Sequence, residues 1–416
     1  MKMKISVSDI KIGMYIDELD RPWIGSPFMF QGFLLSEAEH LEQLVQLCEF
    51  VFVDPEKSTV SVSNNLHLLK SPESDVSAKL FVDTVIIAPQ EMGSSDLEKE
   101  LLKAKKMHDQ TRQYIRHVLK DIYHGVVPDI DKAKELVSEL VTNIVNSPDM
   151  LVLLTQLKDR DEYTAIHSMN VCVLSIAFGR YLCLPLDKLR ALGLAALLHD
   201  VGKMKVARHI LQKPGKLSKE EMSLMKAHAF LGYELLKDEK GMTEEVLAVI
   251  KDHHERIDGS GYPLGLKGEK LTSLTKIVSL VDVYDALTSD RVYKDAMTQT
   301  NALHQLYNMA KNNFEHEFIE SFIKCIGIYP VGSIVEMNTG HVGVVVKLND
   351  DHKLKPVVGL ILSRKKELYD KIKLLNMASD IWQKSSGVKI KIDKVLEAGA
   401  YDLDVHSIIN KVLAGG

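Results

Sequence analysis

The chain has 416 residues, of which 45% are hydrophobic and 26% are charged, and its formal net charge is −5. This length predicts two or three domains, and the composition is typical of globular proteins. The negative charge disfavours a surface that coats a nucleic-acid polymer, because such surfaces carry an excess of Lys and Arg.

Neither a membrane anchor nor a disulfide framework is indicated. The longest apolar runs, such as Ala191–Leu198, are far shorter than the ~20 residues that cross a bilayer. The first residues turn polar within a few positions, unlike a signal peptide. The four cysteines form no Cys-x-x-Cys pair, a pattern typical of reduced thiols. We therefore expect a cytoplasmic protein that makes no membrane contact.

Residues 1–65 predict a small N-terminal α+β domain. Runs of β type at Lys4–Val7 and Phe50–Val53 flank a helix from Ser36 to Cys48, which has a serine cap and apolar residues at helical spacing. Residues 66–95 are rich in Ser, Asn and Pro, which predicts a linker.

The rest of the chain is mainly helical in pattern. Residues 96–146 predict connecting helices that pack on their own domain, since the heptad pattern is too irregular to favour a dimerising helix. Residues 147–335 predict an all-α domain. Residues 336–416 contain β-branched stretches and predict a small β-containing domain. The expected fold class is mainly α, with the two smaller domains flanking the helical one.

Histidines and aspartates recur at helix ends and on apolar helices of the central domain. A lone helical histidine is more often structural, but two adjacent pairs at helix ends and an aspartate in an apolar helix favour a metal site, because an unpaired buried carboxylate is costly. Imidazoles and carboxylates bind transition metals, and a carboxylate can bridge two ions. Two ions ~3.5–4 Å apart can clamp a phosphodiester. The candidate ligands are His167, His199, Asp200, His228, His253, His254 and Asp282.

Two strings within this set resemble a known family. The string His199-Asp200-Val201-Gly202-Lys203 is similar to the signature of the HD-superfamily phosphohydrolases. The later string His253-His254-Glu255-Arg256-Ile257-Asp258-Gly259-Ser260-Gly261-Tyr262-Pro263 resembles the HD-GYP subgroup. Segments 213–217 and 286–294 extend the resemblance in the expected order, so that it covers roughly residues 145–335. The first 60 or so residues resemble a small domain often joined to HD-GYP units.

The resemblance implies an HD-type helical catalytic domain with two divalent metal ions, iron or manganese. One ion would be held by His167, His199, Asp200 and Asp282. The other would be held by Asp200, His228, His253 and His254, with Asp200 bridging. Some members hold a third ion through a Glu one turn before the first His. Because Tyr163 stands at that position here, we expect two ions.

The resemblance also implies substrate contacts. Lys203 lies one turn after His199. It would act in catalysis together with Asp200, by holding a phosphate oxygen. Alternatively, Lys203 is an ordinary surface lysine near a helix end. Arg291 and Lys294 would bind phosphate, or lie on a solvated face. Tyr262 would stack on a base or bond a phosphate, or be an aromatic packed in a tight turn.

The activity that the resemblance implies is hydrolysis of a cyclic dinucleotide by a phosphodiesterase. The leading substrate is cyclic di-GMP, cut at a 3′–5′ phosphodiester to linear pGpG, with further cleavage to GMP left open. Cyclic GMP–AMP is the second substrate. A mononucleotide phosphohydrolase and a non-catalytic sensor acting through protein partners remain as alternatives. The expected partners are a second copy of the chain and proteins such as diguanylate cyclases, and no nucleic-acid polymer is expected.

Overall fold

The computed structural model describes residues 3–20, 33–36, 38–55, 57–60, 94–156, 163–213, 215–289, 296–309, 313–349, 354–379, 390–397, 399–403 and 408. The chain divides into two compact units between residues 87 and 88. The predicted linker, residues 66–95, lies outside the described residues except for its last two, which begin a helix. The predicted domain boundaries stay predictions.

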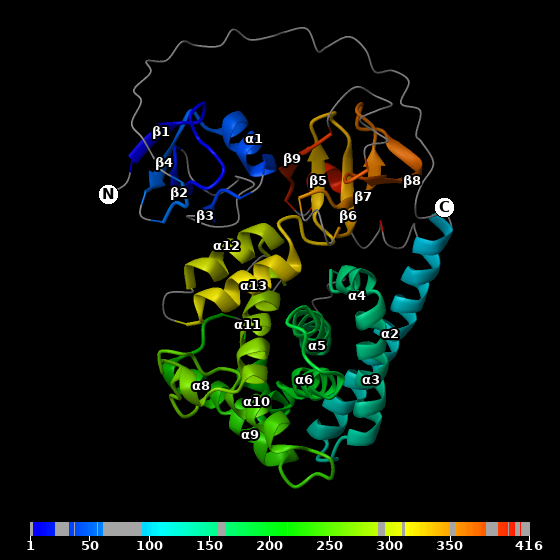
Figure 1. The fold of residues 1–416 in the computed structure, drawn as a ribbon. Helices are drawn as coiled ribbons and strands as arrows, with labels where there is room; N and C mark the ends of the chain where they lie inside the picture. The colour runs from blue at the N-terminus through cyan, green and yellow to red at the C-terminus, as the bar shows by residue number, and fades with distance from the viewer. Residues whose placement is uncertain are drawn as a thin grey trace. The chain divides into compact units, whose positions relative to one another are not determined.

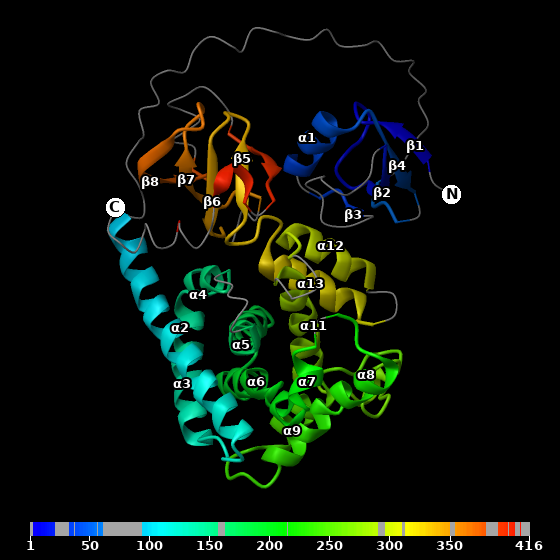
Figure 2. The same ribbon diagram turned by 180° about the vertical axis from the view of Figure 1, so that it is seen from behind.

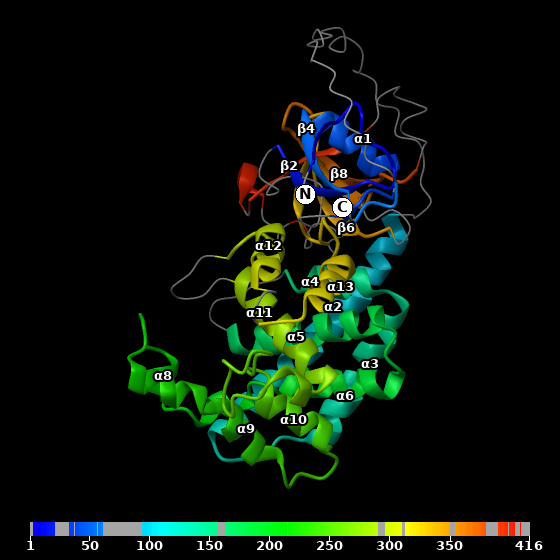
Figure 3. The same cartoon turned by 60° about the vertical axis from the view of Figure 1, so that its left-hand side comes forward.

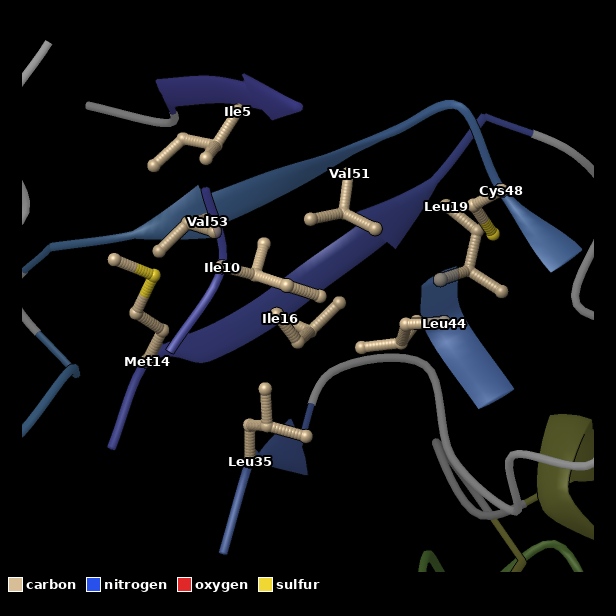
Figure 4. Close-up of a cluster of buried hydrophobic side chains, with 10 residues drawn as sticks. All are labelled: Ile5, Ile10, Met14, Ile16, Leu19, Leu35, Leu44, Cys48, Val51 and Val53. Atoms are coloured by element: carbon tan, nitrogen blue, oxygen red, sulfur yellow. The ribbon is translucent and has the colours of Figure 1, made fainter. Parts of the chain in front are cut away.

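The described residues of the N-terminal unit form one helix on a four-stranded sheet. Strands β1 (Met3–Ser6), β2 (Tyr15–Leu19), β3 (Phe33–Leu34) and β4 (Phe50–Asp54) pair antiparallel in the order β1-β4-β2-β3. Alternate residues of β4, Val51 and Val53, are buried and meet Leu44 of α1 (Ala38–Leu47) in one apolar cluster (Figure 4). The predicted strands and helix of this region are confirmed.

The second unit is mostly helical (Figure 1). Its α-helices are α2 (Ser94–Tyr123), α3 (Ile130–Asn146), α4 (Pro148–Leu154), α5 (Tyr163–Tyr181), α6 (Leu186–Leu198), α7 (Arg208–Leu211), α8 (Lys219–Lys226), α9 (His228–Leu236), α10 (Glu244–Asp252), α11 (Ser273–Thr288), α12 (Gln299–Met309) and α13 (His316–Ile326). Its described residues also form three short 3-10 helices, η1 (Val201–Lys205), η2 (Gly268–Lys270) and η3 (Ala400–Asp402).

Helix α5 is the centre of this helical body. Residues 165–179 are all buried, as expected of a helix that is apolar all round. Helices α6 and α11 pack against it, and α2 covers it from another side through buried residues such as Ile115 (Figure 2). The prediction that the helix after residue 96 packs on its own domain is thus confirmed. Helix α8, by contrast, buries none of its residues and projects at the edge of the body (Figure 3).

A five-stranded antiparallel sheet follows the helices. Its strands, in the order β8-β7-β6-β5-β9, are β5 (Ile334–Met337), β6 (Val342–Lys347), β7 (Val357–Leu362), β8 (Leu368–Asn376) and β9 (Ile392–Val395). Gln299 of α12 joins it to the helices, donating to the Val331 carbonyl at 3.1 Å and accepting from Ser333 Oγ at 2.8 Å. The expected fold class is confirmed. In the part of the chain that is described, no helix is long and apolar enough to span a membrane.

Candidate metal centre

The seven predicted ligands meet in the middle of the helical body. His167 lies inside helix α5 and Asp282 lies inside helix α11, whereas the other five residues lie at helix ends. The ligand atoms form two groups, and within each group all of them lie within 4.8 Å of one another. One group is His167, His199 and Asp282, and the other is Asp200, His228, His253 and His254.

Asp200, a member of the second group, also faces the first. Its Oδ2 lies 3.6 Å from His167 Nε2 and 3.4 Å from His199 Nε2. Its Oδ1 lies 3.3 Å from His228 Nε2 and 3.9 Å from His253 Nε2. Each carboxylate oxygen therefore faces one group, which is the arrangement that a bridging ligand requires.

Three of the histidines are oriented by backbone carbonyls about one helical turn before them. The Nδ1 atoms of His199, His228 and His253 lie 2.7, 2.8 and 2.9 Å from the carbonyl oxygens three residues earlier in the chain. A hydrogen bond from Nδ1–H to a carbonyl fixes the tautomer, so that Nε2 carries a free lone pair. All three Nε2 atoms face the cluster.

The donor atoms fit metal ions. Among the described residues, His199 Nε2 and Asp200 Oδ1 are buried without a hydrogen-bond partner, a costly arrangement unless something else binds them. Burial lowers the pKa of His254 to about 3 and that of His253 well below its usual range, the latter with help from the neighbouring histidines. Both imidazoles are thus neutral at pH 7, the form that binds metal.

The two carboxylates of the centre are ionised. Burial opposes their charge, but Lys203 and His199 hold the pKa of Asp200 well below its usual range. The hydrogen bond from His167 does the same for Asp282. Burial opposes the positive charge of His167, but its hydrogen bonds and charge interactions with Asp282 and Asp285 raise the pKa of this histidine to about 9. The positive charges of His167 and Lys203 thus offset part of the negative charge of these carboxylates.

Gly202 lets η1 approach the first turn of α9. A Cβ at this position would lie 2.0 Å from the backbone oxygen of His228 and 2.5 Å from the nitrogen of Gly232. We expect Gly202→Ala to push His228 away from Asp200 and to lower the free energy of unfolding by about 1–3 kcal/mol, the usual cost of overpacking. Urea denaturation of the metal-free protein measures this loss.

The control for this variant is Gly268→Ala, whose added Cβ would meet Ile257 at the longer distance of 3.1 Å. It should cost less stability. Equal stability of wild type and Gly202→Ala would contradict the close backbone contact.

The glycine-rich loop after His254 folds back on the chain that precedes it. The buried Glu255 carboxylate accepts backbone N–H groups from Leu264 at 2.6 Å, Gly265 at 3.0 Å and Leu266 at 2.9 Å. A Cβ on Gly261 would lie 2.4 Å from the Glu255 Cα, so that only glycine permits this approach. The loop thereby stacks the Tyr262 ring on the His254 ring, with centroids 4.7 Å apart.

The structure places only part of the predicted substrate contacts. Lys203 Nζ lies 2.5 Å from Asp200 Oδ2, at the edge of the centre, and Tyr262 borders it. Arg291 and Lys294 lie outside the described residues.

Two buried carboxylates around the centre were missed by the sequence reasoning. Asp285 hydrogen-bonds His167, and Glu255 holds the glycine-rich loop. Asp285 lies three residues after Asp282, and hence on the same face of an apolar helix, but this spacing does not reveal its contact with His167. Glu255 follows the histidine pair directly, but its loop partners carry no sequence signal.

Comparison with protein families matches three regions. Residues 142–317 match an HD domain, residues 2–133 match a domain of unknown function (DUF3391), and residues 334–380 match a KOW domain associated with HD domains.

Curated relatives agree with these matches. The chain is 34% identical over 370 residues to the cyclic di-GMP phosphodiesterase PA4108 of Pseudomonas aeruginosa, covering 88% of this chain and 87% of the relative. It is 29% identical over 327 residues to a cyclic di-GMP phosphodiesterase of Thermotoga maritima, covering 74% and 88%. A 3'3'-cGAMP-specific phosphodiesterase of Vibrio cholerae is 33% identical over 171 residues, covering 41% and 37%. The chain therefore belongs to the HD-GYP-like family of HD-domain phosphohydrolases, together with the P. aeruginosa cyclic di-GMP phosphodiesterase.

Proposed function

We propose that this protein hydrolyses cyclic di-GMP to linear pGpG. The observation that carries the proposal is the position of Asp200, whose two oxygens each face one group of histidines. Such a centre suits a phosphodiester, and the relative that covers most of the chain is named for cyclic di-GMP. Cleavage of pGpG to GMP would be a second step of the same chemistry.

We infer two divalent ions, iron or manganese, at the two groups. His167, His199 and Asp282 would hold one, His228, His253 and His254 would hold the other, and Asp200 would contact both. When bound, such ions polarise a phosphoryl oxygen and activate water. The mixed imidazole and carboxylate donors suit ions of intermediate softness. No third ion is proposed.

The protein's own groups bind and orient the substrate. Lys203 has 22% of its side chain exposed, whereas Asp200 beside it has 1%, so the ammonium stands where a phosphate arriving from solvent would meet the centre. There it would neutralise charge on the phosphate oxygens as the 3′ oxygen leaves. Tyr262 would contact a base or phosphate at the same rim, and Arg291 and Lys294 would hold phosphate oxygens, the last two from family resemblance.

Cyclic GMP–AMP is the second candidate substrate, since one relative acts specifically on 3'3'-cGAMP. A non-catalytic sensor is the alternative class, but all seven ligand positions are filled and brought together. A second copy of the chain and a diguanylate cyclase remain the proposed protein partners, and the cytoplasm the proposed location.

The test is a product assay by chromatography. The protein, loaded anaerobically with Fe(II) or with Mn(II), is given cyclic di-GMP or cyclic GMP–AMP, beside a metal-stripped sample. We expect pGpG from cyclic di-GMP at the higher rate, and no product from the stripped sample. Faster cleavage of cyclic GMP–AMP would overturn the substrate assignment. Failure to cut either compound with two ions bound would replace the enzyme by the sensor.

A further inference from the structure

Among the ligand histidines, His167 is supported differently from His199, His228 and His253. His199, His228 and His253 each direct Nδ1 to the backbone carbonyl three residues earlier in the chain. His167 instead directs Nδ1 to a carboxylate, Asp285 Oδ2, at 2.8 Å and 118 residues away in the chain. The two groups of ligands are therefore not equivalent.

Asp285 is built into this position. It is fully buried, and its carboxylate accepts hydrogen bonds from three side chains of the described residues. Oδ2 accepts from His167 Nδ1 and from Ser289 Oγ at 3.1 Å, while Oδ1 accepts from Asn170 Nδ2 at 3.0 Å. The Asn170 amide is itself anchored on the Thr155 carbonyl at 3.2 Å. Such a network fixes both the carboxylate and the ring that it contacts.

Helix α11 supplies both a ligand, Asp282, and the residue that supports the neighbouring ligand His167, which is Asp285. Asp282 faces His167 Nε2 at 3.1 Å, and Asp285, one turn later on α11, faces Nδ1 of the same ring. Burying a charged carboxylate costs free energy that its partners must offset. An uncharged amide would avoid this cost, so the presence of a carboxylate at this position indicates that its charge has a role. A carboxylate bonded to Nδ1–H makes Nε2 a more basic ligand.

We propose that Asp285 is a positioning residue that strengthens metal binding specifically at the group of His167, His199 and Asp282. Its charge and its hydrogen bond to His167 set the affinity of that group, while the group of His228, His253 and His254 does not depend on it. The inference rests on the two-metal centre of the proposed function and adds a difference between its two halves.

The test measures metal retention without substrate. Wild type, Asp285→Asn and Asp285→Glu are loaded with Mn(II) and dialysed against graded chelator, followed by elemental analysis and electron paramagnetic resonance. Asp285→Asn keeps the shape but loses the charge. We expect it to release one of two ions at about 10–100-fold lower chelator concentration than wild type, the usual range for a residue that supports a ligand. The remaining ion should show the spectrum of an isolated Mn(II) rather than of a coupled pair.

Asp285→Glu keeps the charge but displaces it, and should fall between wild type and Asp285→Asn. The matched control is Asp252→Asn, which removes another buried carboxylate next to His253 that belongs to neither ligand group. It should retain both ions as wild type does. Circular dichroism of each metal-free variant checks the fold.

Unchanged retention in Asp285→Asn, or loss of both ions together at one chelator concentration, would overturn the inference. A wild type that binds fewer than two ions would instead contradict the two-metal centre of the proposed function. The two failures are therefore distinguishable in the same experiment.

Discussion

Replacing Asp200 by alanine should abolish phosphodiesterase activity and empty the metal centre. Asp200 directs one carboxylate oxygen toward the histidines of each ligand group, and its loss removes the anion that lies against both sets of histidines. We expect kcat to fall by more than about 1,000-fold, beyond the 10²–10³ that a single electrostatic contact is worth. Elemental analysis should find less than one ion per chain after gel filtration.

The control for this variant is Asp187→Ala, which removes an exposed carboxylate from the first turn of α6, the helix that leads to Asp200. It should keep both ions and wild-type activity. Two tightly bound ions in Asp200→Ala would show that Asp200 does not bridge.

The clustering of these histidines and aspartates could be predicted from sequence because their signals are local. His199-Asp200 and His253-His254 are adjacent pairs at helix ends, and Asp282 is a carboxylate in an apolar helix. Each of these polar side chains stands out against the apolar residues beside it in the sequence, because burying an imidazole or a carboxylate among apolar residues is costly. The structure then assembles these residues into two groups around Asp200, as the family resemblance implied.

The residues that orient the ligands could not be predicted in the same way. Asp285 reaches His167 across 118 residues, and Asn170 reaches Asp285 across 115. These pairings depend on how α5 and α11 pack, which side-chain periodicity predicts only as burial. Glu255 bonds backbone N–H groups, which every residue other than proline carries and which therefore leave no mark in the sequence. Periodicity and motifs therefore miss hydrogen-bond partners that lie far apart in the sequence.

Replacing Lys203 by methionine should separate substrate activation from metal binding. Its ammonium lies one helical turn after Asp200 and contacts the Oδ2 of that residue, but its side chain is partly exposed and belongs to neither ligand group. We expect kcat to fall about 10²–10³-fold, as for loss of one charge that stabilises a transition state, with KM changing less and both ions retained. Lys203→Arg, which keeps the charge in a different shape, should recover part of kcat.

The matched control for this experiment is Lys205→Met, two residues along the same η1 turn. Lys205 directs its ammonium to the Ile122 carbonyl at 3.3 Å, away from the ligand groups, so its loss should leave kcat and metal content unchanged. Steady-state kinetics and elemental analysis on the same preparations decide between two roles. Loss of the ions in Lys203→Met would make the lysine a counter-charge for Asp200, because it holds the pKa of that carboxyl down. Loss of kcat with both ions in place would make it the group that meets the phosphate.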